Sequence, residues 1–295
     1  MDLSVIIAAY NSWPCLPECL EAIRAHAGDI RWEVIVVDNA SSDGTPEKLA
    51  VLFPQVCCIV NSANLGFSRG CNQGMRRARG EFFLLLNPDS YLISGTLAAA
   101  VSYLRGHPDV GILGARVLNK DGSLQLACRR SIPTLRSAFF RFAGLSRLFP
   151  RHRALAAYNL THIDEMETAD VESVSGAFMM TRRSLVDKIG GLDERFFMFG
   201  EDLDWCLRVA RAGWRVVYWP DVVIRHLKGQ SIATRRYASL YHFHHAMWLF
   251  YRKHYAAGNG WWKNCAAFGG IWTLGIARVL WEFVRVEALG RKQGS

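Results

Sequence analysis

The chain has 295 residues, of which 51% are hydrophobic and 12% aromatic, and this composition excludes an intrinsically disordered protein. A formal net charge of +9 favours acidic partners, namely nucleic acid, anionic lipid or phosphorylated small molecules. The eight cysteines form no CxxC pair and no zinc spacing, which predicts reduced thiols in a cytosolic protein. The sequence predicts neither a signal peptide nor a transmembrane helix, since no uninterrupted apolar run is long enough.

The first 115 residues alternate between apolar runs and helix-like stretches. The apolar runs predict strands at residues 3–9, 33–37, 56–60, 82–86 and 110–113. The stretches between them predict helices at residues 14–27, 46–53, 68–79 and 96–105. Strands that alternate with helices at this spacing indicate βαβ units, and therefore an α/β fold with a mostly parallel, doubly wound sheet.

Polar residues follow three of these predicted strands. They are Tyr10-Asn11, Asp38-Asn39 and Asn87-Pro88-Asp89. In doubly wound sheets, ligands bind at the carboxyl ends of the strands, so three polar strand ends at one edge predict a binding site. Each could alternatively be a turn, because Asn, Pro, Asp and Ser all favour turns.

Two of these strand ends predict different chemistry. Asp38, in VIVVDNASSDGT, can accept hydrogen bonds from a nucleobase or a ribose hydroxyl; the alternative is a capped turn without a ligand. Asp89, in FLLLNPDS, is a hard oxygen ligand on a rigid strand end, and it suits a metal ion that bridges a diphosphate. Mg²⁺ or Mn²⁺ fits better than zinc, because no Cys/His cluster accompanies it.

The segment NLGFSRGCNQG (64–74) has a glycine at every fourth position. This spacing predicts a smooth helix face for close packing. The functional alternative directs Arg69 and Asn72 toward an anionic ligand, although the segment is neither a GxGxxG motif nor a P-loop.

Two later segments add candidate residues. GEDLDWCLR (200–208) places Glu201, Asp202 and Asp204 at a predicted helix start, where acids either complement the helix dipole or supply a general base. DVVIRHLKGQS (221–231) leads through alternating apolar residues to His226 and Lys228, which are candidate metal or diphosphate ligands. A lone histidine is more often structural.

Two basic, aromatic regions distinguish the second half of the chain. Residues 129–153 hold seven arginines interleaved with apolar residues, and residues 261–285 hold four tryptophans with Lys263 and Arg278. This composition predicts a helix in the bilayer interface, on an anionic membrane surface. A packed helical hairpin or a homodimer interface is the alternative. We expect a catalytic domain at 1–233 and a helical C-terminal extension at 234–295.

Together these motifs resemble the family 2 glycosyltransferases of the GT-A fold, and most of all their bacterial rhamnosyltransferase-like branch. The resemblance covers about residues 3–255 and includes SVIIAAYN, VIVVDNASSDGT, NLGFSRGCNQG, FLLLNPDS, SGAFMMTRR, GGLDERFFMFGEDLDWCLR and a late histidine. It implies a Rossmann-like sheet with flanking helices that binds a nucleotide-sugar donor.

The resemblance also implies roles for individual residues. Ala8, Tyr10 and Asp38, with their neighbours Asn11 and Asn39, would hold the nucleobase and ribose. Arg69, Asn72, Asn87 and Lys228 would lie near the nucleotide or its diphosphate. Asp89 and His226 would bind Mg²⁺ or Mn²⁺, although Asn87 replaces the first acid of the family's DxD motif.

The implied reaction is a single inverting displacement in which Asp202, with Glu201 as its nearest rival, deprotonates an acceptor hydroxyl. We expect a dTDP-rhamnose donor, with UDP-sugars as the alternative. The expected acceptor is a lipid-linked saccharide, and the expected location is the cytoplasmic face of the cell membrane. A nucleotide-binding regulatory module is the non-enzymatic alternative, and no nucleic-acid-binding motif is present.

Overall fold

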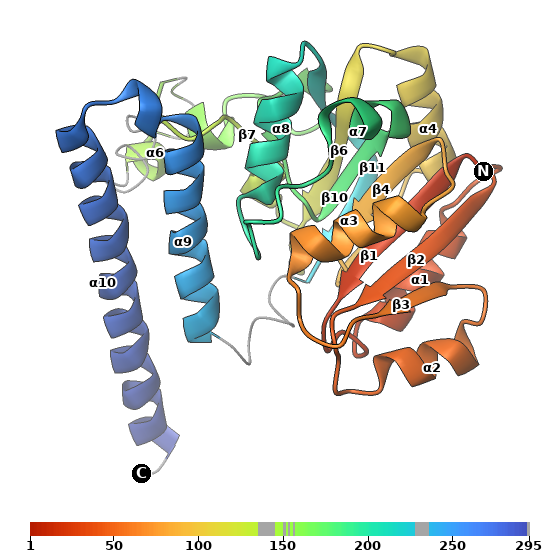
Figure 1. Ribbon diagram of the computed structural model, residues 1–295, viewed down its shortest axis with the longest axis horizontal. Coiled ribbons are helices and arrows are strands. Elements are labelled where there is room, and N and C mark those ends of the chain that lie inside the picture. The colour runs from red at the N-terminus through yellow and green to blue at the C-terminus, as the bar shows by residue number, and fades with distance from the viewer. Residues whose placement is uncertain (135–144, 150–151, 153, 156, 228–235, 294–295) are drawn as a thin grey trace.

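The computed structural model describes residues 1–134, 145–149, 152, 154–155, 157–227 and 236–293, shown in Figure 1. The described residues form a nine-stranded sheet with the order β3-β2-β1-β4-β10-β6-β11-β5, to which β8 is added by pairing with β11. The main strands are β1 (Leu3–Ala9), β2 (Trp32–Asp38), β3 (Cys57–Val60), β4 (Phe82–Leu86), β5 (Ser90–Ser94), β6 (Val110–Leu118), β10 (Phe178–Arg182) and β11 (Arg215–His226). The short strands are β7 (Arg129–Arg130), β8 (Ala169–Asp170) and β9 (Ser173–Val174), with β7 and β9 forming a separate pair.

Helices cover both faces of this sheet, and the last two helices lie beside it. They are α1 (Leu16–Ala25), α2 (Thr45–Leu52), α3 (Phe67–Arg77), α4 (Leu97–Gly106), α6 (Leu145–Leu148), α7 (Arg183–Ile189), α8 (Glu201–Arg211), α9 (Arg236–His254) and α10 (Trp261–Gln293). Helices α3, α7 and α8 lie in front of the sheet in Figure 1, whereas α9 and α10 form a hairpin beside it. The predicted α/β architecture is therefore confirmed.

The expected strands and helices of the first 115 residues all form, with ends that differ by a few residues. The sheet is mostly parallel, because β1 pairs in parallel with β2 and β4, and β6 pairs in parallel with β11. Two of the main strands were not expected. β10 inserts antiparallel between β4 and β6, and β5 pairs antiparallel with β11 at the sheet edge.

The topology brings four strand ends to one edge of the sheet. Since β1, β2, β4 and β11 run in the same direction, their carboxyl ends at Ala9, Asp38, Leu86 and His226 face the same side. The strand interiors are buried on both faces, which explains their continuous apolar runs. This edge is where the sequence predicts a site.

The C-terminal hairpin shares a buried cluster with the α/β body. Ala246, Leu249 and Phe250 of α9 pack on Phe196, which precedes α8. The expected domain boundary at residue 233 lies outside the described residues, and the division into two domains stays a prediction. The expected helical C-terminal extension is present as α9 and α10.

Candidate active site

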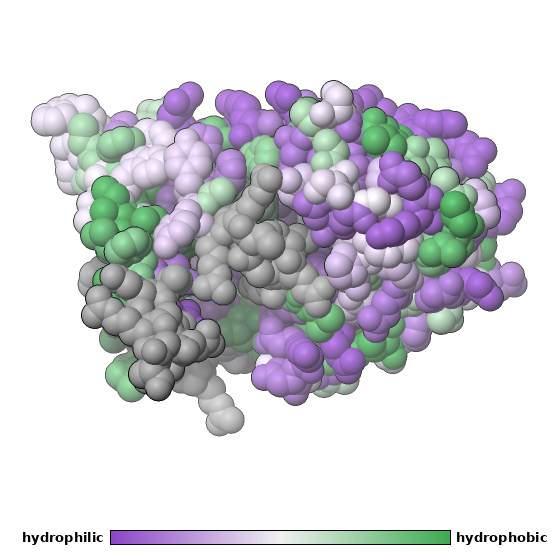
Figure 2. Space-filling model, turned by 90° about the horizontal axis from the view of Figure 1, so that it is seen from below, coloured by the Kyte–Doolittle hydropathy of each residue, from purple (hydrophilic) through white to green (hydrophobic). Residues whose placement is uncertain are grey.

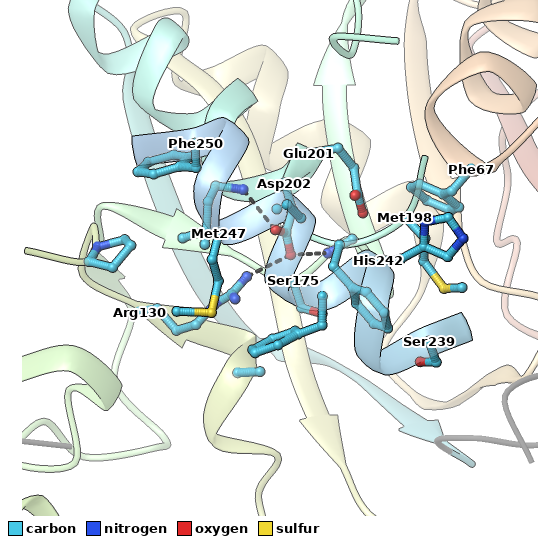
Figure 3. A pocket seen from close by; sticks show the side chains of 18 of the residues that line it. Phe67, Arg130, Ser175, Met198, Glu201, Asp202, Ser239, His242, Met247 and Phe250 are labelled. Carbon is cyan, nitrogen blue, oxygen red and sulfur yellow. Dashed lines mark hydrogen bonds and ion pairs between the residues drawn. The ribbon is translucent and has the colours of Figure 1, made fainter. Parts of the chain in front are cut away.

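A cavity of about 2070 Å³ lies between the carboxyl edge of the sheet and helices α9 and α10. Its walls include Ala8 and Asn39 at two strand ends, Asp89 and His226 at two others, and Asp202 on α8. Figure 3 shows side chains from α8 and α9 that enclose part of it. Sites for one small molecule usually occupy about 300–1,000 Å³. The cavity therefore has room for two substrates side by side.

Asp89 and His226 are neighbours in this cavity. Asp89 lies in the turn after β4, and His226 is the last residue of β11. His226 Nε2 lies 3.2 Å from Asp89 Oδ1 and 3.3 Å from Asn87 Nδ2. Asp89 and His226 are 6% and 8% exposed. The two predicted metal ligands, far apart in the sequence, are thus brought together.

Gln125 orients the imidazole of His226. Its Nε2 donates to the His226 carbonyl oxygen at 2.8 Å, so its Oε1 faces His226 Nδ1 at 3.0 Å and accepts from that nitrogen. This contact assigns the proton of a neutral imidazole to Nδ1 and leaves the lone pair of Nε2 directed at Asp89. Hydrogen bonds of this kind commonly orient histidines that bind metal ions.

The donor set fits a divalent cation that is only partly coordinated by protein. A neutral imidazole lone pair and a carboxylate oxygen at 3.2 Å repel each other unless a cation or proton lies between them. In the described part of the chain, no group of three or more His, Cys, Asp or Glu residues converges. A bound Mg²⁺ or Mn²⁺ would therefore take further ligands from substrate oxygens or water.

The end of the cavity where the sequence predicts a nucleotide is formed by the first two strand ends. Ala8, Tyr10 and Asn39 line it, and Asn39 Nδ2 donates to the Gly66 carbonyl at 3.2 Å. A Cβ atom at Gly70 would lie 3.1 Å from the Ala8 Cβ and 3.3 Å from Asn39 Nδ2. Helix α3 therefore approaches these strand ends closely, as its glycine spacing predicts.

Asp38 and Asn11 make contacts that order the two strand-end loops. Asp38 Oδ2 accepts from the Ser41 N–H at 2.9 Å, and Asn11 Oδ1 accepts from the Ser42 N–H at 2.7 Å. Neither residue lines the cavity. Within the described structure, the fully buried Asp38 Oδ1 has no hydrogen-bond partner. The capped-turn alternative thus describes the observed contacts of Asp38 and Asn11, and Asp38 Oδ1 is enclosed by protein.

The structure does not bring Arg69 or Asn72 to the cavity. Arg69 lies 3.5 Å from Glu194, and Asn72 Nδ2 donates to the Leu192 carbonyl at 2.8 Å. Both side chains of α3 therefore contact the loop before α8, because the opposite face of α3 packs on the sheet. This corrects their expected position beside the nucleotide. Lys228 lies outside the described residues.

Asp202 lies at the start of α8 and accepts hydrogen bonds from three donors. Arg130 Nη2 forms an ion pair with its Oδ2 at 2.6 Å, and the Gly176 N–H donates to the same oxygen at 3.3 Å. The Leu203 N–H donates to Oδ1 at 2.7 Å. Figure 3 shows Asp202 beside Arg130. A carboxylate has about four acceptor positions, so Oδ1 can still accept from a substrate hydroxyl.

Glu201 lines the same cavity but differs from Asp202 in its surroundings. It is 7% exposed, and its Oε2 makes no hydrogen bond within the described residues. Burial, followed by repulsion from Asp202, raises the pKa of Glu201 to about 8. At neutral pH Glu201 is therefore mostly a neutral acid, which can donate a hydrogen bond but cannot take a proton.

The third acid of this segment, Asp204, is structural. It is fully buried and pairs with Arg208 at 2.9 Å, with Lys253 at 2.6 Å and with His254 at 2.7 Å. Lys253 also contacts Asp193 at 2.6 Å. Because Lys253 and His254 belong to α9, this network fastens α9 to the helix that carries Asp202.

Two residues of the site were missed by the sequence analysis. Arg130 was assigned to the basic membrane segment, and Gln125 received no role. Their partners Asp202 and His226 are 72 and 101 residues away. No local pattern signals such contacts, because they arise only when the sheet and α8 assemble.

The mostly parallel sheet, with a carboxylate–histidine pair at its carboxyl edge and an acidic helix start across one cavity, is the architecture of a GT-A glycosyltransferase. Residues 4–190, more than half of the chain, match the family described as glycosyl transferase family 2. The chain therefore belongs to glycosyl transferase family 2. The resemblance found in the sequence is confirmed at this level.

Curated relatives match over most of the chain. It is 28% identical to an N-acetylglucosaminyl-diphospho-decaprenol L-rhamnosyltransferase of Mycobacterium tuberculosis, covering 88% of this chain and 86% of that protein. It is 27% identical to a low-salt glycan biosynthesis hexosyltransferase of Haloferax volcanii, covering 88% of this chain and 76% of that protein.

Solved structures share the fold at lower identity. Residues 1–349 of S. aureus TarS in complex with UDP-GlcNAc match with a TM-score of 0.58 and 19% identity, covering 92% of this chain and 71% of that one. A mannosyltransferase of Pyrobaculum calidifontis in complex with GDP-Man and Mn²⁺ matches with a TM-score of 0.57 and 22% identity, covering 88% and 64%. The chain spans 39% of a longer TarS structure. These likenesses confirm the fold.

Among the described residues, α10 is one helix that could cross a membrane by length and composition alone, whereas the sequence predicts no such segment. Its residues 261–285 are long and apolar enough by length and composition, and 11% of the most apolar window is buried. Arg278 interrupts the apolar run in the sequence, but residues 261–285 remain apolar on average. The expected basic membrane segment at 129–153 lies partly outside the described residues.

Proposed function

We propose that this protein transfers L-rhamnose from dTDP-rhamnose to a hydroxyl of a lipid-linked saccharide in the synthesis of a cell-surface polysaccharide. One observation carries the proposal: the Asp89–His226 pair and Asp202 line the same cavity, so a diphosphate and an acceptor hydroxyl can meet within it. The name of the M. tuberculosis relative supports rhamnose as the sugar and a diphosphate-linked lipid as the acceptor carrier.

The donor binds along the carboxyl edge of the sheet. Ala8, Tyr10 and Asn39, which line the cavity, contact its nucleoside, and Asp38 orders the loop at this end through the Ser41 N–H. Asn87 lies beside His226 and contacts the diphosphate. The structure supplies no contact that separates thymine from uracil, which differ by one methyl group worth about 0.8 kcal/mol on burial.

Asp89 and His226 hold Mg²⁺ or Mn²⁺ at the diphosphate. When bound, this cation neutralises the negative charge that develops on the departing nucleoside diphosphate. Gln125 holds the imidazole so that Nε2 stays available as a ligand. The complex of the P. calidifontis mannosyltransferase with Mn²⁺ supports this assignment.

Asp202 acts as the general base. It takes the proton from the acceptor hydroxyl as that oxygen bonds to the anomeric carbon, and the bond from this carbon to the diphosphate oxygen breaks on the opposite face. The product therefore has inverted anomeric configuration. Arg130 and the Gly176 N–H orient the carboxylate, and Glu201, neutral at pH 7, cannot perform this role.

We infer a peripheral location on the cytoplasmic face of the cell membrane. The long, apolar and mostly exposed helix α10 supports contact with the bilayer, and the net charge of +9 favours an anionic surface. This location brings the cavity beside lipid-linked acceptors.

Titration calorimetry with dTDP and with UDP, each with and without Mn²⁺, tests the donor site. We expect binding that strengthens with Mn²⁺, favours dTDP, and is lost in Asp89→Ala. A clear preference for UDP would replace rhamnose by a sugar carried on UDP. Failure to bind either nucleotide would contradict the proposed donor.

A further inference from the structure

One half of the cavity, between α8 and the C-terminal hairpin, lies beyond the residues assigned above to the donor. Here we call this half the trough; it is lined by Phe243 and Met247 of α9 and by Ala267, Gly270, Ile271 and Leu274 of α10. The trough is mostly apolar and is continuous with the part of the cavity that contains Asp202. Figure 3 shows Met247 close to Arg130 and Asp202.

Two of the ring contacts that hold the hairpin together lie outside the trough. Helices α9 and α10 pack through Tyr241 on Trp272, with ring centroids 5.9 Å apart, and through Trp248 on Phe268, 5.1 Å apart. None of these four residues lines the cavity among the described residues. These ring contacts hold the hairpin without occupying the trough.

Small residues of α10 leave the trough open. A Cβ atom at Gly270 would have no heavy atom of the described structure within 4 Å, beyond its own chain neighbours and helix backbone. The same is true of Gly269, which does not line the cavity. Space at Gly270 is thus space within the trough.

One cation of the trough is linked through two aromatic rings to the loop that precedes α8. The Arg278 guanidinium lies 5.6 Å from the ring centroid of Phe243, and the Phe243 ring meets the Phe199 ring edge-on at 5.8 Å. Phe199 is two residues before Glu201. Of the lining residues described, α9 and α10 contribute the cations Arg278 and Lys263 but no acid. This end of the trough therefore favours an anionic group.

We propose that the trough binds the lipid carrier of the acceptor, with the isoprenoid chain against Ile271 and Leu274 of α10 and the diphosphate beside Arg278. The inference rests on the proposed function and names the site that its acceptor uses. A saccharide on this diphosphate reaches past Phe243 and Phe199, so its hydroxyl meets Asp202. Arg278 thus discriminates diphosphate-linked acceptors from neutral ones.

The exterior of α10 favours a lipid over a protein as the occupant. Trp261, Trp262 and Phe268, which precede Ile271 on this helix, are 79%, 59% and 48% exposed. Figure 2 shows hydrophobic residues and residues of intermediate hydropathy on the hairpin side, whereas strongly hydrophilic residues are frequent over the α/β body. An isoprenoid chain that leaves the trough along this helix passes directly into a bilayer.

Filling the trough tests the site of the chain. The probes are N-acetylglucosaminyl-diphospho-decaprenol and the same sugar diphosphate on a short alkyl chain, with dTDP-rhamnose and UDP-sugars as donors. In Gly270→Leu we expect the acceptor KM to rise at least tenfold for the long chain and to stay unchanged for the short one. Gly269→Leu, the matched control, leaves both values unchanged.

Removing the cation tests the site of the diphosphate. In Arg278→Gln we expect at least a tenfold rise in KM for diphosphate-linked acceptors, with kcat, nucleotide affinity and the KM of a neutral alkyl N-acetylglucosaminide unchanged. Arg285→Gln is the control, because Arg285 is exposed on the same helix and pairs with Glu282. It leaves every constant unchanged.

Two results would overturn the inference in distinguishable ways. Transfer with equal acceptor KM values in Gly270→Leu and Gly269→Leu, and in Arg278→Gln and Arg285→Gln, removes the trough as the acceptor site and leaves the proposed function intact. Absence of transfer from every donor to every acceptor by the unmodified protein overturns the proposed function together with this inference.

Discussion

Adjacent carboxyl groups at residues 201 and 202 have different environments. Asp202 accepts from Arg130 and from two backbone N–H groups, whereas Glu201 is buried with one oxygen unpaired within the described residues. From the sequence, Asp202 is preferred over Glu201 as the general base only through a family resemblance. The contacts supply a physical reason for that order, because a base must be deprotonated and accessible.

Glu201 makes the folded state sensitive to pH. Its pKa rises from 4.5 to about 8 on folding, so the native protein retains a proton that the unfolded chain has lost between these values. As pH rises through this window, the free energy of unfolding therefore falls, by at most about 1.4 kcal/mol per pH unit. Glu201→Gln removes the titrating group.

We expect Glu201→Gln to gain stability relative to the wild type as pH rises from about 5 to about 8. Urea unfolding across this range measures the difference. A difference that does not change with pH would show that Glu201 titrates normally in the folded protein.

Gln125 is the residue through which His226 is oriented. We expect Gln125→Leu to weaken Mn²⁺ binding about 10- to 100-fold, because the imidazole loses the acceptor that fixes its tautomer. Calorimetric titration of Mn²⁺ in the presence of dTDP measures this effect. Asn119→Leu is the control, because Asn119 also lines the cavity but contacts Ser123 instead of His226. Equal Mn²⁺ affinity in the two variants would remove Gln125 from the metal site.

At the scale of elements, the spacing of glycines predicted a packing surface correctly. A Cβ atom at Gly74 of α3 would lie 2.4 Å from Ile6 Cγ2 of β1, so only glycine permits this approach. We expect Gly74→Ala to lower the free energy of unfolding by about 1–3 kcal/mol. Gly106→Ala on α4 is the control, since nothing in the described structure lies within 4 Å of its added Cβ. Denaturant titration measures the free energy of unfolding of both variants. Equal values for the two variants would contradict the close packing of α3 on β1.

The same scale shows why other elements could not be predicted. Strands such as β1 and β4 are long apolar runs bounded by turn residues, and the alternation of strands and helices fixes their parallel order. β10 has only five residues and joins the sheet between strands that precede it in the chain. Its position depends on sheet assembly, which no local pattern encodes. The displaced roles of Arg69 and Asn72 have the same cause, because the orientation of α3 is set by its glycine face.

At the scale of the whole molecule, the C-terminal hairpin joins two surfaces. Its inner side completes the cavity that contains Asp202, and Asp204 fastens it to α8 through Lys253 and His254. Its outer side exposes large apolar residues along α10. The composition of residues 261–285 predicted the apolar outer side. The inner side, which lines the cavity, depends on the packing of α9 on Phe196.

We expect the protein to bind vesicles that contain anionic lipid. Flotation with mixed neutral and anionic vesicles measures the bound fraction, which should fall as salt is added, because the cationic contribution is screened. Trp281→Glu should reduce binding, since Trp281 is 72% exposed on α10. Val51→Glu is the control, because Val51 is 77% exposed on α2 in the α/β body. Equal loss of binding in both variants would contradict a membrane role for α10.

The central claim is inverting sugar transfer with Asp202 as the base. The most direct measurement is NMR of the product formed from dTDP-rhamnose and a diphosphate-linked N-acetylglucosamine acceptor, with the rate compared between wild type and Asp202→Asn. We predict a product whose anomeric configuration is opposite to that of the donor, and a rate that falls about 10²- to 10⁴-fold in Asp202→Asn. A product with retained configuration, or near wild-type transfer by Asp202→Asn, would contradict the mechanism.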